Sequence, residues 1–323
     1  MFTIDTRPLG PIEGTKPLAD YILINKETGE WATILPEFGG ILRQLVLRKG
    51  DIRYTLINSP GSAQALLADE TYASALLYPF PSRVFQGVYR FEGLAYALPM
   101  NETMRSNALH GFVHGKPFRV IRQETTPTHA LLAIVYDYAG DVPGYPFPFA
   151  LTVTYVLSAQ GLTLAFEALN TGTTRSPAAF GWHPYFTLNN APTDDLTLTL
   201  PIQTVVTLDE HMIANGKQPV EDDRLGTFSL DKVELDTPWV TDFSEVDGQK
   251  QAKTVLAWPS EHVSLEITQS DSLGYIVVYT PSRRDSIAIE PQTASVNAFN
   301  NGDGLTILNP GETLSGEIKV QLS

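Results

Sequence analysis

A histidine enclosed by aromatic residues is the first candidate for chemistry in this sequence. Residues 180–186 read Phe-Gly-Trp-His-Pro-Tyr-Phe. Pro184 disfavours helix at His183, so the imidazole is expected at an extended or turn position. Histidine transfers protons near neutral pH, and the flanking rings could stack on the C–H faces of a sugar. The tract therefore indicates an acid–base histidine, with a core histidine in an aromatic cluster as the competing interpretation.

A carboxylate at the end of an apolar run is the complementary candidate. Glu290 follows residues 287–289, Ile-Ala-Ile, and Pro291 ends the run. Partial burial among apolar neighbours would raise the pKa of this carboxyl group toward the range of a general base. A solvated glutamate at a strand end is the simpler interpretation. The polar, turn-rich residues 297–302 that follow predict a loop folded over the site.

Two further tracts carry polar groups suited to binding. Arg83, in Pro-Ser-Arg-Val, has a planar guanidinium that suits paired sugar hydroxyls as well as carboxylates, and a surface salt bridge is its competing role. His110 is followed by Gly111, which permits a tight backbone approach, although such a histidine is often only a turn residue. His110 and His114 have the i, i+4 spacing of zinc ligands, but the adjacent glycines make a helix improbable there, so no metal is expected.

Composition narrows the class of partner. The 323 residues carry a net charge of −14, with 36 acidic and 22 basic side chains, which argues against nucleic acid and favours a neutral small molecule. Without cysteine there are no disulfides and no thiolate nucleophile. The N-terminal residues do not resemble a secretory leader, and no stretch approaches the ~20 apolar residues of a membrane span, so a cytoplasmic protein is expected. Monomer and homodimer both remain open.

Short β-branched and aromatic runs separated by turn residues predict an all-β protein. A hairpin is expected from 20–25 and 30–35 around Lys-Glu-Thr-Gly. Further strands are expected at 131–138, 150–157, 161–169, 196–200, 253–258, 263–269, 276–279 and 287–289. Glycine and proline are spread evenly, so we expect one domain over 1–323, built as a large antiparallel β-sandwich. The main helix candidate is Ser62–Leu77, with a covering loop as the alternative, and the segment is expected to carry no chemistry.

Four tracts, in this order, resemble the aldose 1-epimerase (galactose mutarotase) family. They are Pro81–Val84, Asn107–Phe112, His183–Phe186 with its His-Pro-Tyr-Phe sequence, and Glu290–Thr293 with Glu-Pro-Gln-Thr followed by Asn-Ala-Phe-Asn. The resemblance runs from about Asp20 to the C-terminus. It implies a β-sandwich of the supersandwich type that binds a sugar in an open cleft without a cofactor.

By motif position, the resemblance implies roles for individual residues. Glu290 matches the general base, His183 the general acid, His110 a second active-site histidine and Arg83 an arginine that contacts sugar hydroxyls. A hydroxyl-binding aspartate is assigned to Asp242, with Asp247 as its competitor. The family often has His-Gly-Gly and Asn-Arg-Ile where this chain has His-Gly-Phe and Ser-Arg-Val, which changes the expected cleft wall.

The expected function is therefore interconversion of the α and β anomers of a free hexose such as glucose or galactose. A hexose-6-phosphate epimerase is the nearest competing function, and it would need converging basic side chains, for which the candidates are Arg90, Lys116, Arg119, Arg283 and Arg284. A catalytically silent sugar-binding protein and a purely structural β-sandwich are competing functions of a different class, because a fold does not determine a function.

Overall fold

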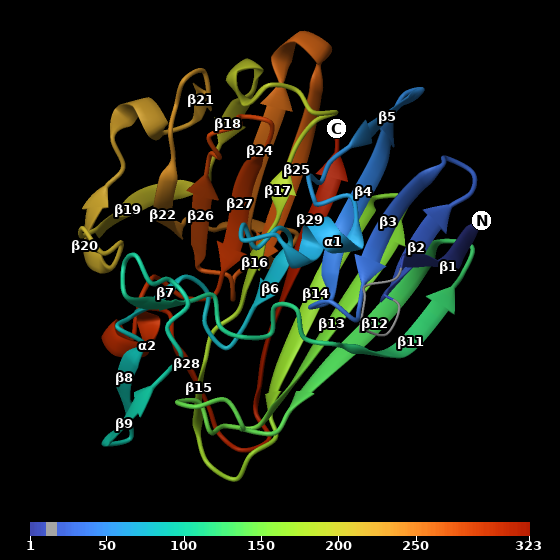
Figure 1. Cartoon of the computed structure of the whole chain (residues 1–323). Helices are drawn as coiled ribbons and strands as arrows, with labels where there is room; N and C mark the ends of the chain where they lie inside the picture. The colour runs from blue at the N-terminus through green and yellow to red at the C-terminus, as the bar shows by residue number, and fades with distance from the viewer. Residues whose placement is uncertain (11–17) are drawn as a thin grey trace.

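Antiparallel strands dominate the computed structural model, which describes residues 1–10 and 18–323 (Figure 1). The N-terminal part forms a five-stranded sheet in the order β1-β2-β3-β4-β5. Its strands are β1 (Phe2–Gly10), β2 (Leu18–Asn25), β3 (Glu30–Leu35), β4 (Ile41–Lys49) and β5 (Ile52–Thr55). The hairpin predicted around Lys-Glu-Thr-Gly is confirmed as β2 and β3, and the all-β prediction is confirmed by the strand content of the described residues.

A ten-stranded sheet forms the largest layer, in the order β11-β12-β13-β14-β29-β25-β24-β18-β21 with β23 paired to β24. Its strands are β11 (Arg119–Thr125), β12 (His129–Tyr138), β13 (Phe149–Ser158), β14 (Gly161–Asn170), β18 (Thr197–Thr199), β21 (Thr227–Ser229), β23 (Ser244–Val246), β24 (Gln249–Trp258), β25 (Val263–Ser270) and β29 (Thr313–Leu322). The predicted strands at 131–138, 150–157, 161–169, 253–258 and 263–269 are confirmed within it.

An eight-stranded sheet follows the order β20-β19-β22-β26-β27-β16-β6, with β17 paired to β27. Its strands are β6 (Ala75–Leu77), β16 (Gly181–His183), β17 (Tyr185–Phe186), β19 (Ile202–Leu208), β20 (Ala214–Pro219), β22 (Asp236–Thr241), β26 (Tyr275–Tyr279) and β27 (Ile287–Gln292). Three two-stranded pairs complete the described strands: β7 (Arg83–Phe85) with β10 (Asn107–Leu109), β8 (Val88–Phe91) with β9 (Leu94–Ala97), and β15 (Ser176–Ala178) with β28 (Thr306–Leu308).

The layers pack through alternating apolar side chains. Along β13 every second residue is buried, the period-2 pattern of a strand with one face on the core. Strand β2 packs on β12 and β13, so the blue five-stranded sheet lies against the green strands in Figure 1. The rings of Phe166 on β14 and Phe180 just before β16 stack at 3.8 Å and join the ten-stranded sheet to the eight-stranded sheet. One apolar core therefore connects all three large sheets.

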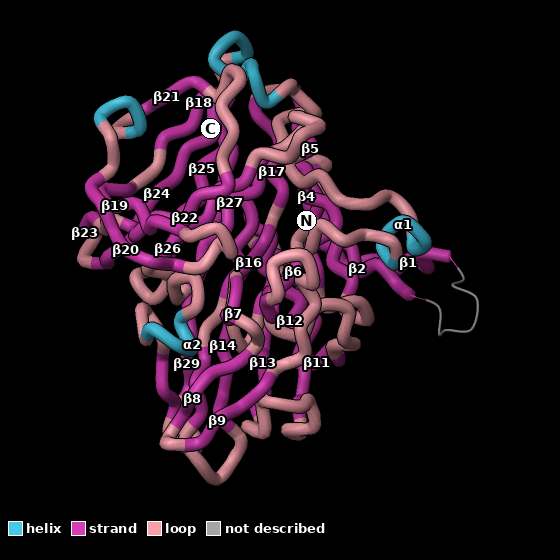
Figure 2. Tube along the Cα trace, turned by 60° about the vertical axis from the view of Figure 1, so that its left-hand side comes forward, coloured by secondary structure: helices cyan, strands magenta, loops and turns pink. Residues whose placement is uncertain are grey.

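Among residues 1–10 and 18–323, helix is confined to short turns at the periphery of the strands, as Figure 2 shows. They are α1 (Ala63–Leu67), α2 (Ala298–Asn301) and the 3-10 turns η1 (Thr193–Asp195), η2 (Asp222–Arg224) and η3 (Pro259–Glu261). The helix predicted over Ser62–Leu77 is wrong beyond its first turn, because the chain then enters β6, where Ala75–Leu77 pair with β16. No helix among the described residues is long and apolar enough to cross a membrane.

Candidate active site

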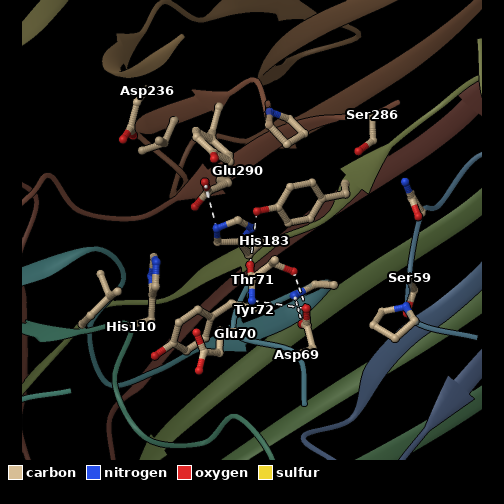
Figure 3. A pocket seen from close by; sticks show the side chains of 18 of the residues that line it. Ser59, Asp69, Glu70, Thr71, Tyr72, His110, His183, Asp236, Ser286 and Glu290 are labelled. Carbon is tan, nitrogen blue, oxygen red and sulfur yellow. Dashed lines mark hydrogen bonds and ion pairs between the residues drawn. The ribbon is translucent and has the colours of Figure 1, made fainter. Parts of the chain in front are cut away.

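A cleft of about 980 Å³ opens on one face of the eight-stranded sheet, and Figure 3 shows the side chains that line it. The register of three strands explains which side chains face it. Val277 lies opposite Glu290, and Pro238 lies opposite Val277. Cross-strand partners and residues two apart share a face, so Asp236, Glu290 and their neighbours point to one side.

Glu290 and His183 form the centre of the cleft. Oε1 of Glu290 lies 3.2 Å from Nε2 of His183 (Figure 3). Oε2 of Glu290 accepts a hydrogen bond of 3.0 Å from Nε2 of Gln292. Both members are almost enclosed, with side-chain exposures of 3% for Glu290 and 8% for His183. All six residues of β27 are buried, so the carboxyl group is not the solvated strand-end glutamate that the sequence left open.

The electrostatics of this pair follow from burial. Burial raises the pKa of Glu290 well above its usual value, and the negative charge of Asp236 raises it further. Burial lowers the pKa of His183. These shifts favour the neutral forms, whereas attraction across 3.2 Å favours the carboxylate with an imidazolium. Burial favours the shared proton on Glu290, and the attraction favours it on His183. The two positions of this proton therefore lie closer in energy than burial alone would leave them.

His110 is oriented by the backbone beside it. Its Nδ1 accepts a hydrogen bond of 3.1 Å from the Ser82 amide, so the neutral ring carries its proton on Nε2 and presents a donor. The ring lies edge-on to that of His183, with centroids 5.2 Å apart. Gly111 holds φ at +67°, and a Cβ there would lie 2.1 Å from the Tyr78 carbonyl oxygen. Glycine is therefore required for this loop to approach so closely.

We expect the burial of His110 to make the protein less stable in acid. Burial first, then the nearby positive charges of His183, Arg83 and His114, lower its pKa well below 6.5. Below pH 6.5 the unfolded chain binds a proton at this residue that the folded chain does not. The free energy of unfolding is therefore expected to fall as pH falls from about 6.5 toward the folded pKa, by up to about 1.4 kcal/mol per pH unit.

Urea unfolding of wild type and His110→Gln between about pH 5 and 8 measures this effect. The variant is expected to show a shallower loss of unfolding free energy on acidification. Comparison of the two slopes isolates His110 from His114, whose pKa burial also lowers. Equal slopes would show that His110 is protonated alike in the folded and unfolded chains.

Arg83, on β7, lines the cleft and forms an ion pair with the carboxylate of Glu102. Its Nε lies 2.9 Å from Oε2 of Glu102, and its Nη2 lies 3.0 Å from Oε1. Arg83 and Arg105 both line the cleft, whereas Glu102 is not part of the lining. The residues after β27, expected to cover the site, instead support β7, because the Asn297 amide donates to the Arg83 carbonyl oxygen.

Neither of the two aspartates assigned to hydroxyl binding from the sequence lines the cleft. Asp242 follows the end of β22, is exposed and does not line the cleft, and Asp247 is exposed in the next hairpin. Asp236, at the start of β22, does line the cleft. Asp236 is open to solvent on one side, as Asp242 is, but partial desolvation within the cleft raises its pKa, with the guanidinium groups of Arg83 and Arg105 acting in the opposite direction. No local pattern distinguishes Asp236 in the sequence; the pairing of β22 with β26 and of β26 with β27 places it there.

A second wall of the cleft comes from residues 68–73, which lie within the segment predicted as a helix. The carboxylate of Asp69 accepts hydrogen bonds from the amides of Thr71 and Ala73. The resulting turn places Tyr72 at φ 58°, with its ring 4.8 Å from that of His110. Among the residues that the structure describes, no group of three or more His, Cys, Asp or Glu side chains is arranged to hold a metal ion.

Comparison with known proteins adds independent findings. Residues 21–321 match the family model described as Aldose 1-epimerase. The uncharacterized Escherichia coli (strain K12) protein YihR is 30% identical over 240 residues, which span 73% of this chain and 75% of YihR.

Solved structures with the same fold are also found. A galactose mutarotase-like protein from Clostridium acetobutylicum superimposes with a TM-score of 0.87 at 19% identity, covering 99% of this chain and 98% of its own. A galactose 1-epimerase from Lactobacillus acidophilus NCFM gives a TM-score of 0.83 at 17% identity, covering 100% of this chain and 99% of its own.

The fold is therefore that of the galactose mutarotase-like proteins, and the family match makes the chain an epimerase, which is an isomerase. The chain belongs to the aldose 1-epimerase family.

Proposed function

We propose that this enzyme interconverts the α and β anomers of a free, uncharged hexose such as glucose or galactose. The observation that carries the proposal is the 3.2 Å contact between His183 and Glu290 in the cleft. The C1 hydroxyl oxygen and the ring oxygen of a pyranose are bonded to the same carbon. Two proton-transferring groups held this close together match the spacing of those two oxygens.

Ring opening requires one base and one acid. The Glu290 carboxylate takes the proton of the C1 hydroxyl, C1 becomes an aldehyde, and the bond from C1 to the ring oxygen breaks. Protonated His183 gives its proton to that oxygen. Rotation about the C1–C2 bond and the reverse transfers then close the ring as the other anomer.

The number of protons held by Glu290 and His183 together supports their role as base and acid. Opening converts carboxylate and imidazolium into carboxylic acid and neutral imidazole, so the pair holds one proton before and after the step. Burial of both groups works against the charged form, and their mutual attraction stabilises it. A pair balanced in this way can give and take a proton without a large change in free energy.

The surrounding polar groups supply binding. Nε2–H of His110 is assigned to donate to the C1 or ring oxygen and to limit charge build-up in the opened sugar. Nη1 of the Arg83 guanidinium and the carboxylate of Asp236 are assigned to neighbouring hydroxyls.

The charges in the cleft favour an uncharged substrate. Of the five basic residues considered for a phosphate, Arg283 alone lines the cleft, and its Nε lies 3.4 Å from an Asp285 carboxylate oxygen. Arg284 is held by Asp194 and by two backbone carbonyls. Three arginines line the cleft, Arg83, Arg105 and Arg283, and the first two are already paired with Glu102. Four acidic side chains line it as well, so a phosphate on C6 would meet more carboxyl groups than guanidinium groups: Asp69, Glu70, Asp236 and Glu290.

A panel of sugars tests the proposal. Relaxation of freshly dissolved α anomers toward equilibrium is followed by polarimetry, with the spontaneous rate subtracted, for glucose, galactose, glucose 6-phosphate and glucuronate. We expect the uncharged hexoses to have the highest kcat/KM. A higher kcat/KM for glucose 6-phosphate or glucuronate would show that the substrate is a sugar charged at C6. A wild-type protein that accelerates none of the four sugars would contradict the assignment of an aldose substrate.

Asp236→Asn is expected to raise KM about tenfold, because a charged hydrogen bond to a hydroxyl is replaced by a weaker neutral one. Asp242→Asn, just after the other end of β22, is the matched control and is expected to leave KM within about twofold, since Asp242 lies outside the cleft lining. Initial rates over a range of hexose concentrations provide both values. A larger rise in KM for Asp242→Asn than for Asp236→Asn would assign hydroxyl binding to Asp242.

A further inference from the structure

The carboxylate of Glu102, which does not line the cleft, accepts hydrogen bonds from three side chains. Besides the contacts from Arg83, its Oε1 accepts a bond of 3.1 Å from Nη1 of Arg105, and its Oε2 accepts one of 2.9 Å from Nδ2 of Asn107. The Glu102 side chain is 11% exposed. Its backbone exchanges two hydrogen bonds of 3.1 Å with Asn107, at the start of β10. Glu102 is therefore fixed from both its backbone and its side chain.

Two arginines of the cleft wall thus share one carboxylate. The bidentate contact uses Nε and Nη2 of Arg83, which leaves Nη1 without a role in the Glu102 pair. Asp236 and Glu290 line the same cleft, and at each of them the charge of Arg83 opposes the rise in pKa that burial causes. An arginine released from Glu102 would have these two carboxylates as new partners, and bidentate ion pairs of this kind are among the strong ones.

We propose that Glu102 is a positioning residue that holds Arg83 at the cleft wall, keeps Nη1 of Arg83 available to sugar hydroxyls and prevents Arg83 from forming an ion pair with Glu290. The inference rests on the proposed function, because it assigns Glu290 the part of the base. Glu102 also offsets positive charge from Arg83 and Arg105. The catalytic carboxylate therefore remains free to accept a proton although an arginine lies in the same cleft.

The groups that face the catalytic pair determine how its titration responds. Those on the neighbouring elements are Tyr185 on β17, Asp236 on β22, Tyr279 on β26, Arg83 on β7, His110 and His114 after β10, and Asp69 between α1 and β6. Only Arg83 among them is held directly by Glu102. A change at Glu102 consequently reaches Glu290 through the position and charge of Arg83.

The test is Glu102→Gln, with kcat and KM measured by polarimetry across about pH 4 to 9. The amide removes the charge that holds both guanidinium groups but can still accept one hydrogen bond. We expect kcat to fall at least about tenfold and the acid limb of the pH profile to move to lower pH by about one unit, because a closer Arg83 favours the Glu290 carboxylate. Glu102→Asp keeps the charge, so its kcat and the pH of its acid limb are expected to lie between those of Glu102→Gln and wild type.

Two further variants separate positioning from a structural role. In Glu102→Gln combined with Arg83→Gln, the acid limb is expected to return toward its wild-type position, because the displaced charge is gone. Glu92→Gln is the matched control, since Glu92 pairs with Arg175 outside the cleft lining, and it is expected to change neither kcat nor the acid limb.

The inference is overturned if Glu102→Gln keeps the wild-type acid limb and kcat, or if it lowers only the melting temperature while the folded fraction keeps both. If Glu102→Gln does not fold, Glu102→Asp carries the same comparison, because its shorter side chain should weaken the grip on Arg83. Should the wild-type protein accelerate no sugar, the proposed function fails separately. Calorimetric glucose affinity of wild type and Glu102→Gln then decides the positioning role, with equal affinities overturning it.

Discussion

Glu290→Gln is expected to lower the enzyme-catalysed rate of anomer interconversion by about 10²–10⁴-fold, the usual contribution of a general base. Glutamine preserves the shape of the side chain but cannot take the C1 hydroxyl proton. The fold is expected to tolerate the change, because burial already opposes the charge on this group and Gln292 remains as a hydrogen-bonding neighbour.

Polarimetric relaxation of α-glucose or α-galactose measures the effect, with the spontaneous rate subtracted and the melting temperature recorded alongside. Glu317→Gln, the same chemical change at an exposed side chain on β29, is the control and is expected to keep wild-type activity. A Glu290→Gln protein with a near-wild-type rate would remove Glu290 from the mechanism.

His183→Gln is expected to cause a loss of similar size, because His183 is the imidazole in direct contact with Glu290 and the proposed donor to the ring oxygen. The two residues share one proton, so their effects should not add. The double variant with Glu290→Gln is expected to be about as slow as either single variant. His129→Gln on β12, outside the cleft lining, serves as the control.

The pH profile gives a second measure of His183. Wild-type activity is expected to follow a bell. It is lost on the acid side when the pair binds a second proton, and on the alkaline side when the pair loses its only proton. Residual activity of His183→Gln should no longer show the alkaline limb set by the pair. An unchanged rate and profile in this variant would assign the proton donor to another group, with His110 a neighbouring imidazole ring at 5.2 Å between centroids.

Local sequence patterns determined most of the strand content of this protein. Period-2 burial along β13 and β25 is directly readable as apolar–polar alternation, since each strand has one face on the core. The helix expected at Ser62–Leu77 failed because alanine and leucine favour helix weakly, whereas residues 75–77 are drawn into the eight-stranded sheet by pairing with β16.

The sequence by itself also indicated His183, Glu290, His110 and Arg83, because each lies in an unusual local tract that a single pass along the chain can detect. The tertiary structure decided their environment. It buried Glu290 against His183, brought Asp236 to the cleft in place of Asp242, and set Glu102 behind Arg83. The contacts of Arg83 with Glu102 and of His183 with Glu290 join residues 19 and 107 positions apart along the chain. They depend on which strands pair and in what register, and strand pairing is a property of the whole sheet that no local pattern encodes.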